Sequence, residues 1–139
     1  MNNENVGYCG LYCGGCKIYQ STISGKPEID ENNKPIYCDG CASSRLTGWC
    51  STCKIKECNQ KKGIRFCIEC NLNPCEMLIA FMNDSKYPYH QEIQKDMKSI
   101  KELGVIKWIK IKDKQYHCKK CNNLINWFET KCSQCDENI

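Results

Sequence analysis

The sequence predicts a small metal-stabilised α+β protein: an irregular, α-rich and cysteine-rich N-terminal part with helices, followed by a C-terminal zinc-ribbon β-hairpin. The chain has 15 cysteines in 139 residues, a density typical of a metal-held or cross-linked scaffold. Without these cysteines, fewer than a third of the residues are apolar, which is little for a stable core. Two CxxC pairs near the end have the spacing of a zinc site. We expect a cysteine-rich domain over 1–104 and the ribbon over 105–139.

The thiols are more consistent with metal binding than with disulfides. The opening MNNENVGYCG has no basic segment followed by an apolar run, so we expect a cytoplasmic chain without a secretion signal. No run approaches the roughly 18 apolar residues of a membrane span. Clustered cysteines in a reducing compartment more often bind metal, and the odd count fits complete pairing poorly. Disulfides and unligated core cysteines stay open as alternatives.

The segments between the cysteines predict short helices. Residues 6–25 are a Gly-rich cysteine cluster that leads into a short helix, and residues 26–37, rich in Pro, Asn and acidic residues, are expected to form a loop. The stretch Asn73-Pro74-Cys75-Glu76 predicts a helix start, with Asn73 as the N-cap and Glu76 closing a capping box. That helix would run to residue 84.

Two further helices are expected beyond it. Apolar residues three or four positions apart predict one that ends at Gly104: Tyr89, Ile93, Met97, Ile100 and Leu103. The segment VIKWIKIK, residues 105–112, has features of both a helix and a strand, and we favour a short helix.

The C-terminal segment KQYHCKKCNNLINWFETKCSQC predicts a zinc ribbon. Two CxxC turns facing each other supply a tetrahedral site of four thiolates, here Cys118, Cys121, Cys132 and Cys135. Asn122 and Asp136 follow the two turns and tolerate the positive φ that such knuckles require. The intervening residues 122–131 suit a β-hairpin. Four sulfurs leave no open position, so the site would be structural, and His117 would face the hairpin instead of the metal.

The other eleven cysteines form three triads and one pair. The triads are Cys9, Cys13 and Cys16; Cys50, Cys53 and Cys58; and Cys67, Cys70 and Cys75, while the pair is Cys38 and Cys41. The second and third triads share the pattern C-x₂-C-x-[I/L]-x₂-C, with Ile55 and Leu72 equivalent, which indicates two copies of one metal-binding turn. The pair can complete two triads, so one triad lacks a fourth sulfur.

Three chemistries can account for that leftover triad. A Cys₃His zinc site would use His90, the histidine outside the ribbon, although a surface helix position is the simpler interpretation. A [4Fe–4S] cluster on Cys9, Cys13 and Cys16 would leave one open iron, as in a redox protein or small enzyme. Three free thiols would suit a metal buffer or redox sensor, with Cys75 the most acidic at a helix start. A radical-SAM barrel is excluded, since it needs about 200 residues or more.

These motifs resemble a known family. YCGLYCGGC, the pair CDGC, CSTCKIKEC, KKGIRFCIECNLNPCEML and the later GVIKW with its ribbon are similar to the prokaryotic cysteine-rich family called domain of unknown function 3795, over residues 7–135. Lys17 stands where members often have Pro. The family has no established activity, so the resemblance implies metal binding and a cytoplasmic prokaryotic setting, and no reaction.

The expected function is that of a zinc-binding structural or interaction module. The formal charge of +4 treats every Cys as neutral, and three four-thiolate zinc sites would make it about −2, so it says nothing of a partner. Residues 95–120 hold nine Lys and three acidic residues, a solvated face or a contact for protein or nucleic acid. Nearby aromatic residues would be ribbon core or contact surface: Trp108, Tyr116, Trp127 and Phe128. The sequence shows no catalytic triad, phosphate loop or paired carboxylates.

Overall fold

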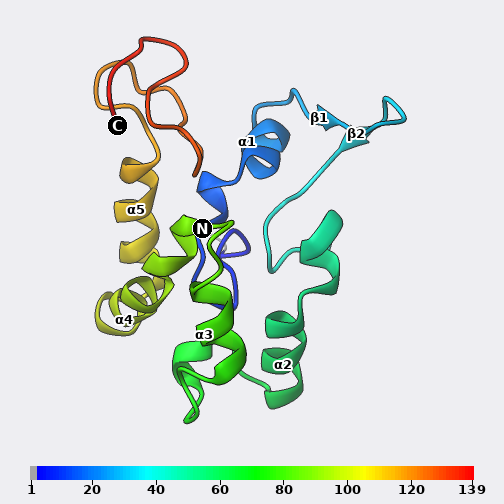
Figure 1. Cartoon of the computed structure of the whole chain (residues 1–139), viewed down its shortest axis with the longest axis vertical. Helices are drawn as coiled ribbons and strands as arrows, with labels where there is room; N and C mark the ends of the chain where they lie inside the picture. The colour runs from blue at the N-terminus through cyan, green and yellow to red at the C-terminus, as the bar shows by residue number, and fades with distance from the viewer. Residues whose placement is uncertain (1–2) are drawn as a thin grey trace.

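The computed structural model describes residues 3–139, which form five short helices and one two-stranded sheet (Figure 1). The helices are α1 (Lys17–Ile23), α2 (Lys54–Lys62), α3 (Glu76–Met82), α4 (Ile93–Leu103) and α5 (Val105–Gln115), and the strands are β1 (Glu28–Ile29) and β2 (Pro35–Ile36). Short 3₁₀ helices lie at Cys13–Gly15, Gly48–Thr52, Cys67–Glu69 and Pro88–Glu92. In Figure 1, α2 and α3 occupy one end of the molecule, and the C-terminal segment lies beyond α5 at the other.

Helix α4 takes part in both apolar clusters of the helical body. Its Ile93 and Met97 pack with Leu78, Ile55 and three cysteines: Cys9, Cys53 and Cys67. Its Ile100 packs in the second cluster with Val6, Tyr12, Phe66, Trp108 and Ile109. Thiols therefore occupy positions that aliphatic side chains fill in most proteins, so anything the thiols bind is continuous with the core.

The predicted helices near the C-terminus are confirmed. Helix α4 ends at Gly104, whose φ of +83° suits glycine, and α5 follows it directly. Leu103, expected on the apolar face, is instead largely exposed. Trp108 is core of the helical body instead of ribbon core or contact surface, because α5 turns it onto α4.

A buried ion pair joins α4 to α5. Lys112 Nζ lies 3.1 Å from Asp96 Oδ2, and the Trp108 indole N–H donates to the other oxygen of this carboxylate over 3.3 Å. Both charged side chains are almost fully buried. Burial raises the pKa of Asp96, and Lys112 opposes that effect.

Two local expectations are wrong. Residues 26–37 are not simply a loop, because β1 and β2 pair antiparallel around a turn that the Asp30 carboxylate closes by accepting from the N–H groups of Asn32 and Lys34. Helix α3 is capped by Cys75 instead of Asn73, with no capping-box bond. The Asn73 backbone N–H, which a capping box would require for Glu76, instead donates to the carbonyl of Cys70 in the preceding turn. The division into domains at residue 104 stays a prediction.

Within residues 3–139 no helix combines the length and the apolar character that crossing a membrane requires.

Candidate metal centres

The C-terminal cysteines converge on one point. The sulfurs of Cys118, Cys121, Cys132 and Cys135 all lie within 4.8 Å of one another, and two of the Sγ–Sγ distances are 3.5 Å. A tetrahedral zinc ion with bonds of about 2.3 Å would set its sulfurs about 3.8 Å apart, whereas a disulfide needs about 2.05 Å. All fifteen cysteines of the chain are free thiols. The tetrad therefore has the size of a four-thiolate metal site.

The backbone builds this tetrad from two matching knuckles. The residue after each CxxC has a left-handed conformation, with φ of +64° at Asn122 and +61° at Asp136, as the sequence predicted. The N–H groups of these residues donate back to the carbonyls of Cys118 and Cys132 over 2.8 and 2.9 Å. An aliphatic residue would be strained at either position, so the short polar side chains fit the sulfur geometry.

Local dipoles favour the thiolate at two of the four positions of the tetrad, Cys118 and Cys132, whereas burial and the neighbouring thiols raise the pKa of Cys121 and Cys135. Backbone N–H groups of Cys121 and Lys120 lower the pKa of the Cys118 thiol. Burial disfavours the Cys132 thiolate, but the N–H groups of Cys135 and Gln134 and the neighbouring thiols outweigh burial and lower its pKa to about 6. Metal binding by thiols requires thiolates, so a cation at the tetrad would find Cys118 and Cys132 predisposed to that form and would displace protons from Cys121 and Cys135.

The expected β-hairpin over 122–131 is not confirmed. In the described residues its two ends pair outward, through isolated bridges between His117 and Leu124 and between Lys131 and Asn138. The two ends of the ten-residue spacer thus close the two knuckles separately. Between them, residues 126–129 form a turn in which the Glu129 backbone N–H donates to the Asn126 carbonyl over 3.2 Å. His117 contacts the carbonyl of Asp113 through Nδ1 at 2.6 Å and lies outside the tetrad.

The tetrad segment is fastened to the cysteine cluster at the start of the chain. The Trp127 backbone N–H donates to the Gly15 carbonyl over 2.9 Å, and the Trp127 ring stacks on the Tyr89 ring with centroids 4.2 Å apart. Gln20 Nε2 donates to the carbonyls of Gly14 and Ile125. A Cβ at position 15 would collide with the Trp127 indole, so glycine is required for this close approach. Phe128 beside it is largely exposed.

Seven N-terminal cysteines line one cavity of about 310 Å³, the seven-cysteine cavity. They are the first triad, the pair and the first two members of the second triad: Cys9, Cys13, Cys16, Cys38, Cys41, Cys50 and Cys53. The Cys41 N–H donates to Cys13 Sγ over 3.3 Å, which ties the triad to the pair. In the part of the chain that the structure describes, the C-terminal tetrad is the one group of three or more possible ligands whose ligand atoms all lie within 4.8 Å of one another. No three sulfurs of the seven-cysteine cavity are therefore that close together.

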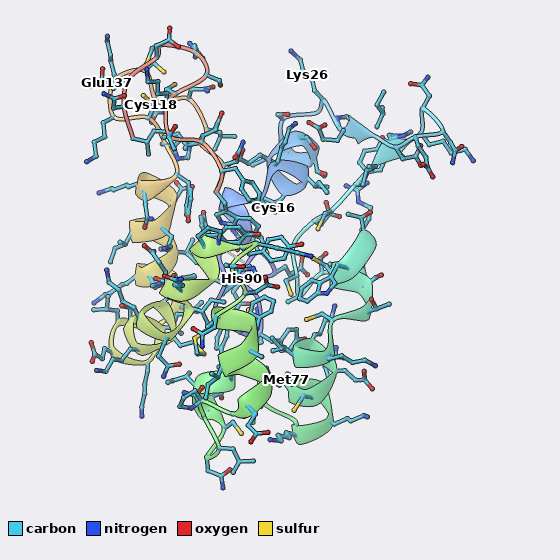
Figure 2. The ribbon with its side chains drawn as sticks, in the orientation of Figure 1. Cys16, Lys26, Met77, His90, Cys118 and Glu137 are labelled. Atoms are coloured by element: carbon cyan, nitrogen blue, oxygen red, sulfur yellow. The ribbon has the colours of Figure 1, made fainter. Side chains whose placement is uncertain are left out.

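Aromatic side chains form another wall of the seven-cysteine cavity, which the sequence analysis missed. His90 is buried and not on the surface, and it stacks between Phe81 and Tyr87 at centroid distances of 3.9 and 5.0 Å. Its Nδ1 lies 3.0 Å from the Phe81 carbonyl, which can only accept, so Nδ1 carries the proton and Nε2 keeps a free lone pair. Figure 2 shows Cys16 and His90 near the middle of the molecule, away from Cys118.

Burial favours the neutral thiol at two positions of this cavity, Cys13 and Cys50. It raises the pKa of Cys50 to about 12, with the nearby Cys41 adding to the effect. The pKa of Cys13 is raised well above its usual value, again first by burial and then by Cys41. A cation bound beside these two thiols would favour their thiolates, so loading this cavity would release protons.

The last four cysteines line a separate small pocket of about 20 Å³, the four-cysteine pocket. Its thiols are Cys58, Cys67, Cys70 and Cys75. The expected second triad is therefore divided, because Cys53 caps the start of α2 while Cys58 lies in its second turn. At 1.5 Å per residue these backbones are about 7.5 Å apart along the helix axis.

The two sequence copies also differ in structure. Ile55 is buried in α2, but its counterpart Leu72 is 64% exposed in a turn. The equivalence of Ile55 and Leu72 as two copies of one turn is therefore wrong. The cavities thus divide the N-terminal cysteines into seven and four, and the C-terminal tetrad contains the remaining four.

Comparison with protein families matches residues 5–80 to the family described as "Protein of unknown function (DUF3795)". The match covers more than half of the chain. The chain belongs to this family. The matched part of this DUF3795 protein contains the seven-cysteine cavity's thiols and the four-cysteine pocket's thiols, and the C-terminal tetrad lies outside it. Searches of curated proteins and of solved structures found no match.

Proposed function

We propose that this DUF3795 protein is a zinc-binding structural module whose metal ions shape a surface for binding another macromolecule. The observation that carries the proposal is the C-terminal tetrad, in which four free thiols lie within 4.8 Å of one another. Zinc suits this site, because it is a redox-inert ion that binds four thiolates in a closed tetrahedral shell. A closed shell has no position for water or substrate, which favours a structural role over catalysis.

The proposed contact surface is the Lys-rich segment 95–120. Eight of its nine lysines are exposed, the exception being Lys112 in its buried ion pair. Exposed apolar residues lie on the same helices, including Ile106 and Ile111 of α5. Basic side chains beside apolar ones suit an acidic partner, either a protein or a nucleic acid.

Metal analysis tests the zinc part of the proposal. Chain purified without chelators should contain zinc, and the double variant Cys118→Ser/Cys132→Ser should lose one zinc ion per chain. The matched variant Ser133→Ala, in the same knuckle, should keep the full content. Equal zinc in both variants would refute binding at the tetrad.

Binding to a short fluorescent DNA duplex tests the surface. Lys107→Glu/Lys110→Glu reverses two exposed charges on α5, and Lys26→Glu/Lys34→Glu makes the same change in net charge near the β1–β2 pair. Only the α5 variant should weaken binding and flatten its salt dependence. Equal effects of the two variants would show that net charge alone is responsible. If neither the wild type nor the variants bind the duplex, the same two variants would be used to test an acidic protein as the partner.

A second candidate function, iron–sulfur redox chemistry, is favoured by the size of the seven-cysteine cavity. At about 310 Å³ it exceeds the four-cysteine pocket more than tenfold, and Cys9, Cys13 and Cys16 line it together. A cluster on these three thiols would have one open iron, for which the other thiols of the cavity and His90 are candidate ligands. Anaerobically purified protein would then be brown and absorb near 400 nm, and Cys13→Ser would remove the absorbance. Colourless protein with zinc alone would exclude this candidate.

A further inference from the structure

We propose that Cys58, Cys67, Cys70 and Cys75 bind a single metal ion as a closed four-thiolate site, independent of the C-terminal tetrad. The site draws one thiol from α2 and three from the turn and cap that lead into α3. It groups Cys58 with the third triad, against the sequence pattern that places it with Cys50 and Cys53. Because the two sites share no residue, either one can lose its metal ion while the other keeps it.

Polar hydrogens already point at the sulfurs of this pocket. Asn59 Nδ2 donates to Cys67 Sγ over 3.1 Å, and Lys62 Nζ donates to Cys70 Sγ over 3.2 Å. The Leu72 N–H donates to the same Cys70 sulfur over 3.4 Å. Hydrogen bonds to ligand atoms orient metal ligands and are typical of the groups around metal sites, so the pocket has the surroundings of bound thiolates as well as the thiols.

The size of the pocket selects a single ion. Its free volume of about 20 Å³ is close to that of one water-sized sphere, too small for a cluster or an organic ligand. The buried apolar side chains of Ile55 and Leu78 line one part of it. The sulfurs lie further apart than those of the tetrad, so the ion would draw them inward around this space. Met77, labelled in Figure 2, marks the α3 side of the pocket.

Two further features suit a bound cation with four thiolates. Asn73 lines the pocket, and its Oδ1 is buried without a hydrogen-bond partner. A nearby positive ion would stabilise that oxygen electrostatically. The Lys62 ammonium group offsets part of the net charge of −2 that a divalent ion with four thiolates carries. The neighbouring Lys61 instead pairs with Glu57 on the outer side of α2.

Alkylation of the zinc-loaded full chain distinguishes this grouping from the one the sequence suggests. Trypsin separates the thiols conveniently, because peptide 46–54 contains Cys50 and Cys53 while peptide 66–86 contains Cys67, Cys70 and Cys75. In Cys58→Ser, N-ethylmaleimide should label peptide 66–86 and leave 46–54 as protected as in the wild type. In Cys50→Ser, peptide 66–86 should stay protected. Peptide 121–131, with Cys121, reports the tetrad in the same digest.

A lysine pair tests the site without removing any thiol. Lys62→Met should lower zinc affinity at this site about 10–100-fold, the range for residues around a metal site, whereas Lys61→Met should not change it. Zinc competition with a chelator, followed by labelling of peptide 66–86, measures both. Because all four ligands remain, this pair covers the case in which Cys58→Ser fails to fold.

The outcomes are decisive in both directions. Labelling of peptide 66–86 in Cys58→Ser but not in Cys50→Ser, with loss of one zinc ion per chain, supports the site. Labelling of peptide 46–54 in Cys58→Ser, together with labelling of Cys58 in Cys50→Ser, would show that the second triad shares one ion and would overturn the proposed site. Full labelling of peptide 66–86 in the zinc-loaded wild type, with peptide 121–131 protected, would overturn the site while leaving the proposed function intact.

Discussion

We expect that removing the proposed C-terminal ion unfolds the tetrad segment and leaves the helices in place. Within the small cluster of residues 117–139, Ile125 is the single buried side chain that is not a cysteine. Its burial contributes about 1.5–3 kcal/mol, whereas structural zinc contributes about 10–16 kcal/mol to folding in small zinc domains. Ordering each residue costs about 1–2 kcal/mol of backbone entropy, so one isoleucine cannot hold the segment. An ion bound to the tetrad would therefore be the dominant stabilising contribution there.

Hydrogen exchange of Cys118→Ser/Cys132→Ser measures this effect residue by residue. The amides of Ile125 and Ile139, which donate to Tyr116 and Thr130 over 2.9 and 3.0 Å, should lose their protection. Amides of α4 should keep theirs, and the matched variant Ser133→Ala should resemble the wild type throughout. Persistent protection of Ile125 in a metal-free double variant would refute the reasoning, because contacts with the helical body alone would then suffice.

Three further changes test the helical body. Leu78→Ala should destabilise the protein by about 2–5 kcal/mol in denaturant unfolding because Leu78 is fully buried, while Ile79→Ala on the exposed side of α3 should cost far less; equal costs would show that the packing is misassigned. Lys112→Met should lower the free energy of unfolding by about 3–5 kcal/mol, because it leaves the buried Asp96 carboxylate without its ion-pair partner; an unchanged melting curve would contradict this. Gly15→Ala should push the Trp127 ring away from the body and shift its fluorescence to the red, whereas an unshifted spectrum would mean that the contact adjusts without separation.

Local signals in the sequence predicted those parts of the fold that depend on neighbouring residues. The three-to-four spacing of Ile93, Met97 and Ile100 placed the buried face of α4, and Gly104 placed its end. Asn122 and Asp136 were identified because positive φ is costly for most side chains. In each case the relevant physics lies within one helical turn or one knuckle.

Local signals in the sequence could not predict which cysteines lie together in space. Cys58 follows Cys53 by five residues in a pattern that Cys70 and Cys75 repeat, but only the first interval is helical. The difference arises from tertiary packing, since Ile55 has a core to enter and Leu72 does not. His90 was underestimated for the same reason, because its stacking partner Phe81 belongs to a different helix. Lys62 lies one helical turn beyond Cys58 on the same face of α2, and that spacing is the sequence signal that could have placed Lys62 beside the thiols.

Circular dichroism of reduced protein, recorded on heating before and after complete removal of metal, tests the central claim most directly. The thiols occupy core positions of this DUF3795 protein, and apolar residues other than cysteine are few, so cohesion is assigned mainly to sulfur-bound ions. Metal-free protein should lose its cooperative transition and much of its helical signal, and both should return when zinc is restored. An identical transition with and without metal would contradict the claim.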